Sequence, residues 1–329
     1  MKKIVRLAAA LLAAVTLLAG CSGGVDPSNI DYIQLRAPEE GQDIAIMDTT
    51  LGEITILLYT EEVPTVVQNF KDLVNEGFFD GQVIYQVVPT AGAVLFGSET
   101  DDGMSPDTNT GKPIEAEYSD NLWPFTGAVC ALCGDQGQFL TRKTYFDSRS
   151  FFVAEKEIDE ETRAKMVENY FPAMMMNAFE DLGGAPGLSQ YHTVFGKVIQ
   201  GMDVVNAIAS ADMTEIELTE EEKAQMEDGV EYETPYRPTE DVIINSVTLS
   251  TYHAEDYETL DNTYTEEEYQ DLVQRSEIDQ AAIDEAIQDG TYGQSDTSAE
   301  SGASTENSAT ESSTESAGSA ESSEASQAE

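Results

Sequence analysis

An amide side chain stands inside a short run of strand-forming residues, VIYQVVP at positions 83–89. In an extended strand successive side chains alternate between two faces, so Ile84, Gln86 and Val88 share one face. An amide buried against valines with its polar atoms unpaired would cost about 1–3 kcal/mol. We therefore expect Gln86 on a wet face, or beside a group that comes there to bond it, which makes it a candidate binding residue.

A second candidate for chemistry is the C-x-x-C pattern CALC at 130–133, which is typical of redox or zinc sites. The surrounding GAVCALC is apolar and strand-like, and three residues of extended chain place the two Cα atoms roughly 10 Å apart. A disulfide needs less than about 7 Å. Zinc lacks ligands, because His192 and His253 are the only histidines. The pattern favours small apolar strand residues over redox chemistry, and no metal or cofactor is expected.

The N-terminal residues predict export and lipid attachment. A basic start, MKKIVR, precedes an apolar run over 7–18, which is too short for a membrane span of roughly 20 residues but suits a secretory signal over 1–20. The run ends in LAGC, which resembles the lipobox of bacterial lipoproteins. This resemblance implies that Cys21 becomes the lipidated mature N-terminus, so we expect an extracytoplasmic protein anchored to the cell membrane by that lipid.

The charge balance excludes one class of partner. The 329 residues include 63 acidic and 16 basic side chains, for a net charge of −47. Such a chain is repelled by phosphate backbones and by anionic lipid headgroups. We therefore expect no nucleic-acid binding and no polybasic membrane contact, while the 40% apolar content is enough for a real core.

The elements that must position these residues are mainly strands. After a flexible spacer at 21–41, two period-two runs joined by Thr50-Leu51-Gly52 predict a β-hairpin. A helix is predicted next, with Pro64 in its first turn and Gly77 at its end. Further strands are expected at 83–89, 93–97, 127–133, 150–154, 193–199 and 241–250. Short strands in this number favour a closed antiparallel barrel or a sandwich.

Two insertions and a tail complete the chain. Residues 155–187 are acidic and helical in pattern, interrupted by Pro172, and residues 211–240 contain a predicted helix, TEEEKAQMED. The tail covers 253–329. Thr265 and Glu268 have the spacing of a capping box, so one or two short helices are expected to about residue 289. Beyond them the Ser/Glu-rich sequence predicts disorder.

Two long stretches resemble the cyclophilins, which are peptidyl-prolyl cis-trans isomerases. The block at 50–89, beginning TLGEITILLY, is similar to the opening half of that family, and HTVFGKVIQGMDVVNAIA at 192–209 to its other well-marked stretch. Weaker similarities at 111–122, 127–133 and 148–156 follow in order between them. The resemblance implies a cyclophilin-like domain over 42–252, with a closed eight-stranded antiparallel barrel capped by helices and a substrate groove on its outer wall.

The resemblance also implies the site residues. The family arginine that donates to the prolyl peptide group lies in a Phe-His-Arg-Val-Ile stretch, which here reads Ile84-Tyr85-Gln86-Val87-Val88. Gln86 therefore takes the catalytic position. The substrate-binding residues carried over from the family motifs are Tyr85, Cys133, Ser150, Phe152, Leu188 and His192.

The departures from the family pattern concern the centre of the groove. Ser150 stands for the glutamine of the family's Gln-Phe-Phe stretch, and Gly187 for its tryptophan. A hydrogen bond from a neutral amide is about half as strong as a charge-assisted one. We therefore expect reduced activity, which Gln86→Arg should raise. Arg149 should point away from Ser150 and Phe152, so it is not expected to replace the missing charge.

The resulting hypothesis is a monomeric, lipid-anchored isomerase that acts on proline-containing segments of exported polypeptides. The alternative is a non-catalytic chaperone or scaffold module that binds proline-containing segments without accelerating rotation. A solute-binding lipoprotein is disfavoured, because the sequence has no two-lobed α/β alternation.

The lipid anchor makes a direct prediction. Cys21→Ala removes the thiol to which the lipid would be attached, so the protein should move from the membrane fraction to the soluble fraction. Immunoblots of the two fractions measure this, with Cys130→Ala as the control. Unchanged membrane association of the Cys21 variant would refute lipidation.

Overall fold

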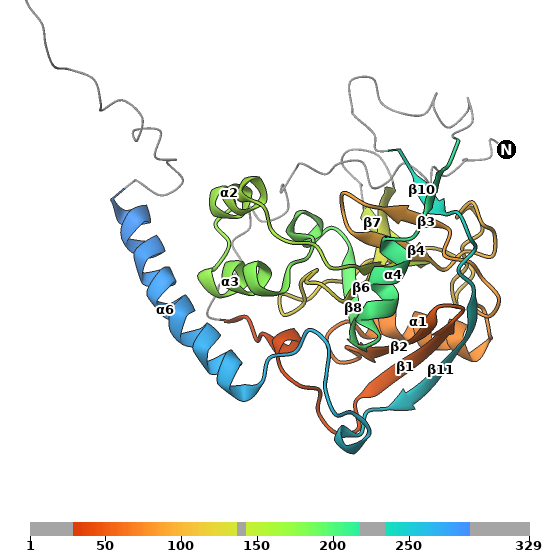
Figure 1. Ribbon diagram of the computed structural model, residues 1–329, viewed down its shortest axis with the longest axis horizontal. Coiled ribbons are helices and arrows are strands. Elements are labelled where there is room, and N and C mark those ends of the chain that lie inside the picture. Colours follow the sequence, from red (N-terminus) through yellow and green to blue (C-terminus); the bar gives the residue numbers. More distant parts are fainter. Residues whose placement is uncertain (1–28, 137–142, 218–233, 290–329) are drawn as a thin grey trace, which may run out of the picture. The chain divides into compact units, whose positions relative to one another are not determined.

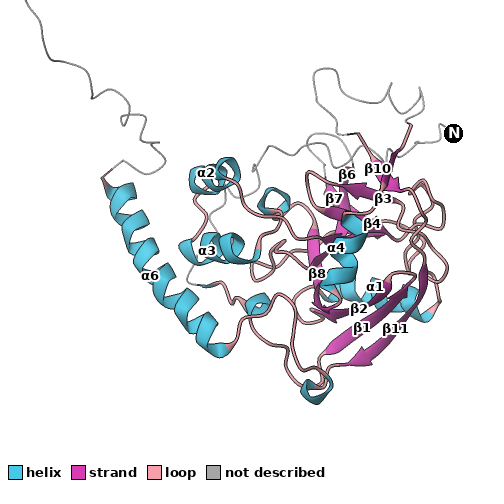
Figure 2. Ribbon diagram, viewed as in Figure 1, coloured by secondary structure: helices cyan, strands magenta, loops and turns pink. Residues whose placement is uncertain are grey.

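The computed structural model describes residues 29–136, 143–217 and 234–289 (Figure 1). The strands are β1 Asp43–Thr49, β2 Gly52–Leu58, β3 Gln86–Val88, β4 Ala93–Phe96, β5 Ile114–Glu115, β6 Ala128–Gln136, β7 Lys143–Val153, β8 Thr193–Gln200, β9 Met213–Glu215, β10 Tyr236–Pro238 and β11 Ile244–Thr251. The α-helices are α1 Pro64–Asn75, α2 Glu160–Glu168, α3 Ala173–Leu182, α4 Met202–Ala209 and α6 Glu266–Gln288. The predicted domain consists mainly of strands (Figure 2). The insertion at 155–187 and the C-terminal segment are mainly helical.

The strands form one antiparallel sheet in the order β11-β1-β2-β8-β6-β7-β4-β3-β10-β9, with β5 paired to β7. This order has two ends, so the closed eight-stranded barrel expected from the sequence is not confirmed. An isolated bridge joins Val83 to Ile243. Around it, Ile84 N donates to Val242 O at 2.9 Å, and Ile244 N donates to Gln82 O at 2.8 Å. The chain therefore meets itself just before β3 and β11, while β10 and β9 extend the sheet beyond β3.

The first local predictions are confirmed. β1 and β2 form the hairpin, with Ile44 opposite Leu57 and Thr49 opposite Gly52. Helix α1 begins at Pro64, where the missing N–H costs no helical hydrogen bond, and Gly77 follows its end with a φ of 69°. Its buried residues Val66, Phe70, Leu73 and Val74 fall on the predicted face.

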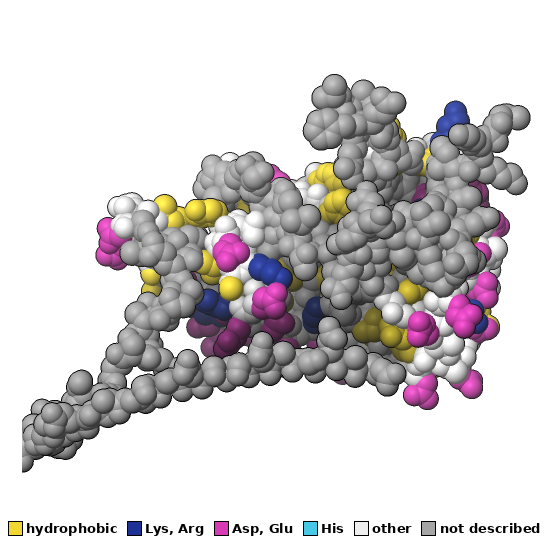
Figure 3. Space-filling model, turned by 90° about the horizontal axis from the view of Figure 1, so that it is seen from above, with side chains coloured by type: hydrophobic (Ala, Val, Ile, Leu, Met, Phe, Trp, Pro, Cys, Tyr) yellow, Lys and Arg dark blue, Asp and Glu magenta, His cyan; other side chains and the backbone are white. Residues whose placement is uncertain are grey.

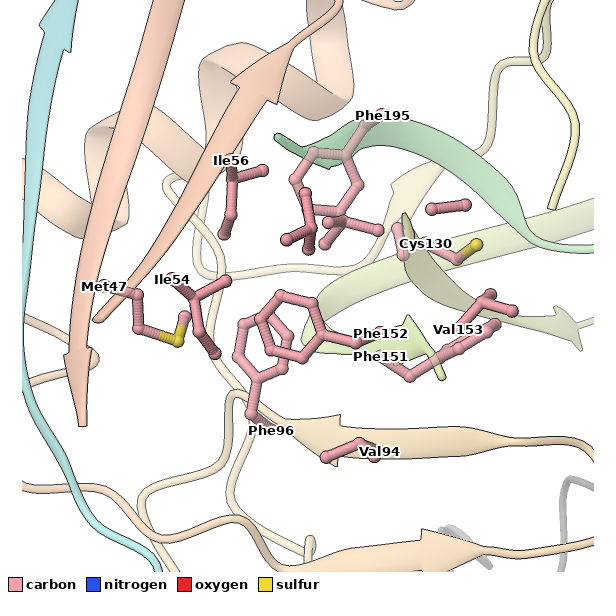
Figure 4. Packing of buried hydrophobic residues seen from close by; sticks show 14 of the residues in the cluster. Met47, Ile54, Ile56, Val94, Phe96, Cys130, Phe151, Phe152, Val153 and Phe195 are labelled. Atoms are coloured by element: carbon pink, nitrogen blue, oxygen red, sulfur yellow. The ribbon is translucent and has the colours of Figure 1, made fainter. Parts of the chain in front are cut away.

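The main core lies on the inner face of the sheet. Figure 4 shows Met47, Ile54 and Ile56 opposite the rings of Phe96 and Phe152, with Phe195 beside them. Phe96 and Phe152 stack with ring centroids 4.9 Å apart. A chain of aromatic contacts continues from Phe96 through Phe79 and Phe70 to Phe195. This packing fixes which side of β4 and β7 points inward.

A second core joins the segment before β1 and helix α6 to residues 123–179 of the predicted domain. It consists of Ile30, Tyr32, Leu35, Trp123, Phe125, Met166, Phe171, Met175, Met176, Ala178, Phe179 and Leu272. The sequence predicts a flexible spacer over 21–41, but in its described part Leu35 is fully buried. The insertion supplies the methionines as gap-filling core residues, as expected.

The insertion and the tail have the predicted helical breaks and caps. Asp159 caps α2, and Pro172 directly precedes α3. Thr265 and Glu268 form the predicted capping box, but α6 is one helix of 23 residues instead of short pieces. The predicted helix at 219–228 and the predicted disorder beyond residue 289 lie outside the described residues.

Lys197 connects β8 to both flanking segments. Its Nζ donates to Gln34 O at 2.6 Å and to Thr263 Oγ1 at 2.7 Å, and the side chain is 3% exposed. Burial lowers the pKa of Lys197 to about 7. The segments before β1 and after β11 are thus held to the sheet by polar contacts as well as by the second core.

Acidic side chains are spread over the surface seen in Figure 3, where only a few basic ones interrupt them. Among the described residues, no helix has the length and hydropathy needed to cross a membrane. The signal and the lipid site at Cys21 fall outside these residues.

The second core predicts that α6 is required for stability. Leu272→Ala removes a fully buried side chain, so we expect a loss of about 2–5 kcal/mol in the free energy of unfolding. Ile278→Ala on the same helix is the control, since Ile278 is 67% exposed and should change stability by no more than about 0.5 kcal/mol. Urea unfolding measures both. Equal effects would show that the second core contributes no stability.

Candidate functional site

The register of three strands decides which side chains share a face. Gln86 on β3 lies opposite Leu95 on β4, and Leu95 lies opposite Phe151 on β7. Directly opposed residues of antiparallel strands point to the same side. Gln86, Leu95 and Phe151 therefore lie on one face, which we term the outer face because it is opposite the face that carries Phe96 and Phe152. Leu95 and Phe151 are themselves buried and belong to the main core. β3 and β7 are two strands apart, roughly 10 Å.

Two sequence-predicted site residues lie on the other face. Phe96 is opposite Ser150, and Val94 is opposite Phe152. Phe152 stacks on Phe96 inside the main core and is fully buried (Figure 4). Ser150 and Phe152 are thus separated from Gln86 by the sheet itself. Of the two adjacent phenylalanines, Phe151, one position before Phe152, shares the face of Gln86.

Phe151 is the phenylalanine that contacts His192. Its ring meets the His192 ring edge-on, with centroids 5.2 Å apart and an interplanar angle of 85°. His192 directly precedes β8, whose Val194 lies opposite Cys130, the partner of Phe151 on β6. The structure therefore brings His192 beside Phe151, whereas the resemblance groups it with Phe152.

His192 is held in one neutral form. Cys133 N donates to His192 Nδ1 at 3.0 Å, so the ring proton is on Nε2. Burial lowers the pKa of His192 to about 3. Nε2 has no hydrogen-bond partner among the described residues. The site therefore contains a buried N–H group that is available to donate to a peptide carbonyl.

Leu188 and Cys133 complete the surroundings of this histidine. Leu188 is 7% exposed, ends the short helix Pro186–Leu188, and accepts a hydrogen bond from His192 N at 3.4 Å. Cys133 binds His192 through its backbone, while its Sγ contacts Ala131 O and Thr193 Oγ1. Both Cys130 and Cys133 are free, and burial raises the pKa of each thiol. These thiols are unreactive at neutral pH, as expected for apolar strand residues.

Tyr85 precedes Gln86 in the chain, and its ring packs against Gly103. Its ring leaves no room for a side chain at position 103, where a Cβ on Gly103 would lie 2.7 Å from Tyr85 Cε2. The Tyr85 hydroxyl is buried and has no hydrogen-bond partner among the described residues. Burial raises the pKa of Tyr85, so the hydroxyl stays protonated and remains a possible donor.

A bulge in β7 contains the ion pair of Arg149 and Asp147. The sequence predicts that Arg149 points away from the site. Ala131 lies opposite Ser150 and Cys133 opposite Phe146, so residues 147–149 of β7 face Leu132 alone. Extra residues in one strand re-aim its side chains. Arg149 Nε donates to Asp147 Oδ1 at 2.9 Å, and Nη2 donates to Asp147 Oδ2 at 2.7 Å. The spacing of an acid and a base two residues apart in a strand was the signal for this pair.

All these side chains are buried. Gln86 is 4% exposed, His192 2% and Arg149 8%, so the wet face expected around Gln86 is not what surrounds it. Burial strengthens each hydrogen bond that a bound peptide would make here. The outer face thus holds a neutral amide, an apolar ring and a histidine Nε2 without a partner among the described residues, all of them buried.

The chain belongs to the family described as "Cyclophilin type peptidyl-prolyl cis-trans isomerase/CLD", whose sequence model matches residues 44–248. This is the isomerase family that the sequence resembles, and the matched range lies within the domain predicted over 42–252. The family match identifies the chain as a cyclophilin-type isomerase.

Bacterial relatives carry the same name. A Staphylococcus saprophyticus protein, provisionally described as a peptidyl-prolyl cis-trans isomerase, is 28% identical over 182 residues, which cover 55% of this chain and 88% of the relative. A Staphylococcus aureus protein of that description is 28% identical over 181 residues, with the same coverage. A Streptococcus pyogenes protein, provisionally described as a bifunctional phosphatase and isomerase, is 24% identical over 226 residues, and the match covers 42% of it.

Solved structures include a cyclophilin-type isomerase of Cryptosporidium parvum. It covers 65% of this chain and 99% of its own, with a TM-score of 0.43 and 14% identity.

The two histidines predict opposite titration behaviour. His192 should keep constant ring resonances from pH 8 to pH 5, because burial lowers its pKa to about 3. His253 is the internal control, since its hydrogen bond to Glu40 raises its pKa above 6.5. Histidine-selective NMR measures both. Because the folded state excludes the His192 proton, its contribution to stability should be lost as pH falls below 6.5. A His192 midpoint near 6.5 would contradict the buried neutral ring.

Proposed function

We propose that this chain catalyses cis-trans isomerisation of Xaa-Pro bonds in exported polypeptides, while anchored to the outer side of the cytoplasmic membrane through lipid on Cys21. The observation that carries the proposal is the grouping of Gln86, Phe151 and His192 on one buried face. The family match to residues 44–248 supports the reaction. The N-terminal signal pattern and lipobox support the location.

The chemistry requires little beyond placed donors and an apolar contact. Rotation about a peptide C–N bond is slow because partial double-bond character gives a barrier of about 18–20 kcal/mol. As the bond twists, the prolyl nitrogen loses conjugation and becomes a better hydrogen-bond acceptor. A donor aimed at the twisted group stabilises that state more than the planar one, which is what accelerates rotation.

The described residues supply this machinery in a weakened form. The Phe151 ring is the apolar surface for the proline ring, and His192 Nε2–H is the donor for a substrate carbonyl. At the position of the family arginine, the Gln86 amide still has N–H donors but no charge. Loss of one catalytic donor typically costs about 10²–10³ in rate. We therefore propose a reduced rate for a site that depends on Gln86 alone.

The neutral amide also favours a second candidate function. If Gln86 only holds the prolyl group, the site would bind proline-containing segments without accelerating their rotation, as a chaperone or scaffold. The same face would then serve recognition, because the ring contact and the histidine donor do not depend on twisting of the bond.

Turnover separates these two functions. The full chain should accelerate cis-trans exchange of a short Ala-Pro peptide, measured by NMR exchange spectroscopy. Phe151→Leu should lower kcat/KM at least tenfold, because the surface that binds the proline ring is lost. Phe152→Leu is the matched control: it removes the same number of atoms from the opposite face, and should lower stability but not kcat/KM.

Two outcomes would contradict the proposal in different ways. Saturable peptide binding without faster exchange would establish the binding module. Loss of activity in the Phe152 variant but not in the Phe151 variant would show that the outer face is not the site.

A further inference from the structure

Gln86 leaves the site without the positive charge of the family arginine, and one other buried side chain on the outer face can supply it. Among the described residues, Arg149 and Lys197 are the only basic side chains that are buried. Lys197 Nζ is held by Gln34 O and Thr263 Oγ1, where β8 meets the flanking segments. Arg149 lies two residues from Phe151 along β7, so alternation places it on the same side as Phe151 and Gln86.

The backbone beside Arg149 on the side of β4 carries no side chain. Across β4 its neighbour is Gly97, whose φ is 93°. A Cβ at Gly97 would lie 2.1 Å from Ser148 O and 3.2 Å from Arg149 Cα, so the two backbones approach too closely for a side chain. Gly103 packs against the Tyr85 ring, and its carbonyl oxygen lies 3.5 Å from Arg149 Nη1, so the guanidinium lies near the residue that precedes β3.

The guanidinium is held firmly at one edge and only weakly at the other. Asp147 accepts from Nε and Nη2, which fixes the plane of the group. Among the described residues, Nη1 has only a contact of 3.5 Å with Gly103 O, which is too long for a strong hydrogen bond. A planar fork bound bidentately at one edge keeps its other N–H groups pointing in a defined direction. Arg149 is therefore a preorganised charged donor with unused capacity.

We propose that Arg149 provides the charged hydrogen-bond donor of this isomerase site, from β7 instead of β3. The one-residue shift that places Phe151 beside His192 also moves Arg149 into the position of the glutamine in the family's Gln-Phe-Phe stretch. The glutamine on β3 and the arginine on β7 have thus exchanged places. This inference rests on the proposed isomerase function and assigns its charge to a residue that the sequence match leaves outside the site.

An exchange of the two residues tests the proposal. Arg149→Gln should lower kcat by about 10²–10³ with a smaller change in KM, because the donor acts on the twisted state. The double variant Gln86→Arg with Arg149→Gln should recover activity to within about tenfold of the native chain. Gln86→Arg alone should give no gain, in contrast to the increase expected from the sequence. Arg163→Gln, which removes a surface ion pair with Glu180, is the control.

Each outcome decides a different point. An inactive native chain would refute the proposed function itself. An active chain whose Arg149→Gln variant keeps kcat within about threefold would overturn only the role of Arg149. If Arg149→Gln fails to fold, Arg149→Lys replaces it. The lysine keeps the charge beside Asp147 but has no second amino group for the substrate, so kcat should fall with little change in Tm. An unchanged kcat would overturn the proposal.

Discussion

The register of β7 between β4 and β6 determines the site. Adjacent residues of a strand point to opposite faces, so a shift of one residue exchanges every inward side chain for an outward one. Here Phe152 enters the main core against Phe96, and Phe151 meets His192. The stacked pair anchors this choice, because turning Phe152 outward would leave a large hole beside Phe96. The core thereby selects which residues face a substrate.

Local patterns were sufficient to predict most of the elements. The β1–β2 hairpin, the start of α1 at Pro64 and the capping box at Thr265 depend on neighbouring residues and on turn chemistry. They were predictable because the forces that form them act within a few positions. The family motif groups His192 with Phe152, whereas in the structure the His192 ring meets Phe151.

The faces of β7 could not be predicted in the same way. The sequence places two phenylalanines side by side, and either could match the family residue. Three residues of β7 oppose one of β6 at the bulge, and no local pattern marks that irregularity. The second core escaped prediction for a related reason. Leu35, Phe179 and Leu272 come from three distant segments, and each looks like an isolated apolar residue in its own surroundings. Only the folded chain brings them together.

A reaction that needs only placed donors tolerates such rearrangement. No covalent intermediate forms when an Xaa-Pro bond rotates, so no proton must be passed along a fixed route. What matters is the electrostatic potential at the twisted nitrogen, and a charge can approach that point from more than one strand of the sheet. Neutral His192 is consistent with this requirement, because its N–H group donates without adding a second charge near Arg149. The pairing of Arg149 with Asp147 also keeps the guanidinium charged despite burial, since the charge and hydrogen bonds of Asp147 outweigh the cost of desolvation. A buried ion pair that would be a costly way to stabilise a fold therefore has a reason to be present at this face.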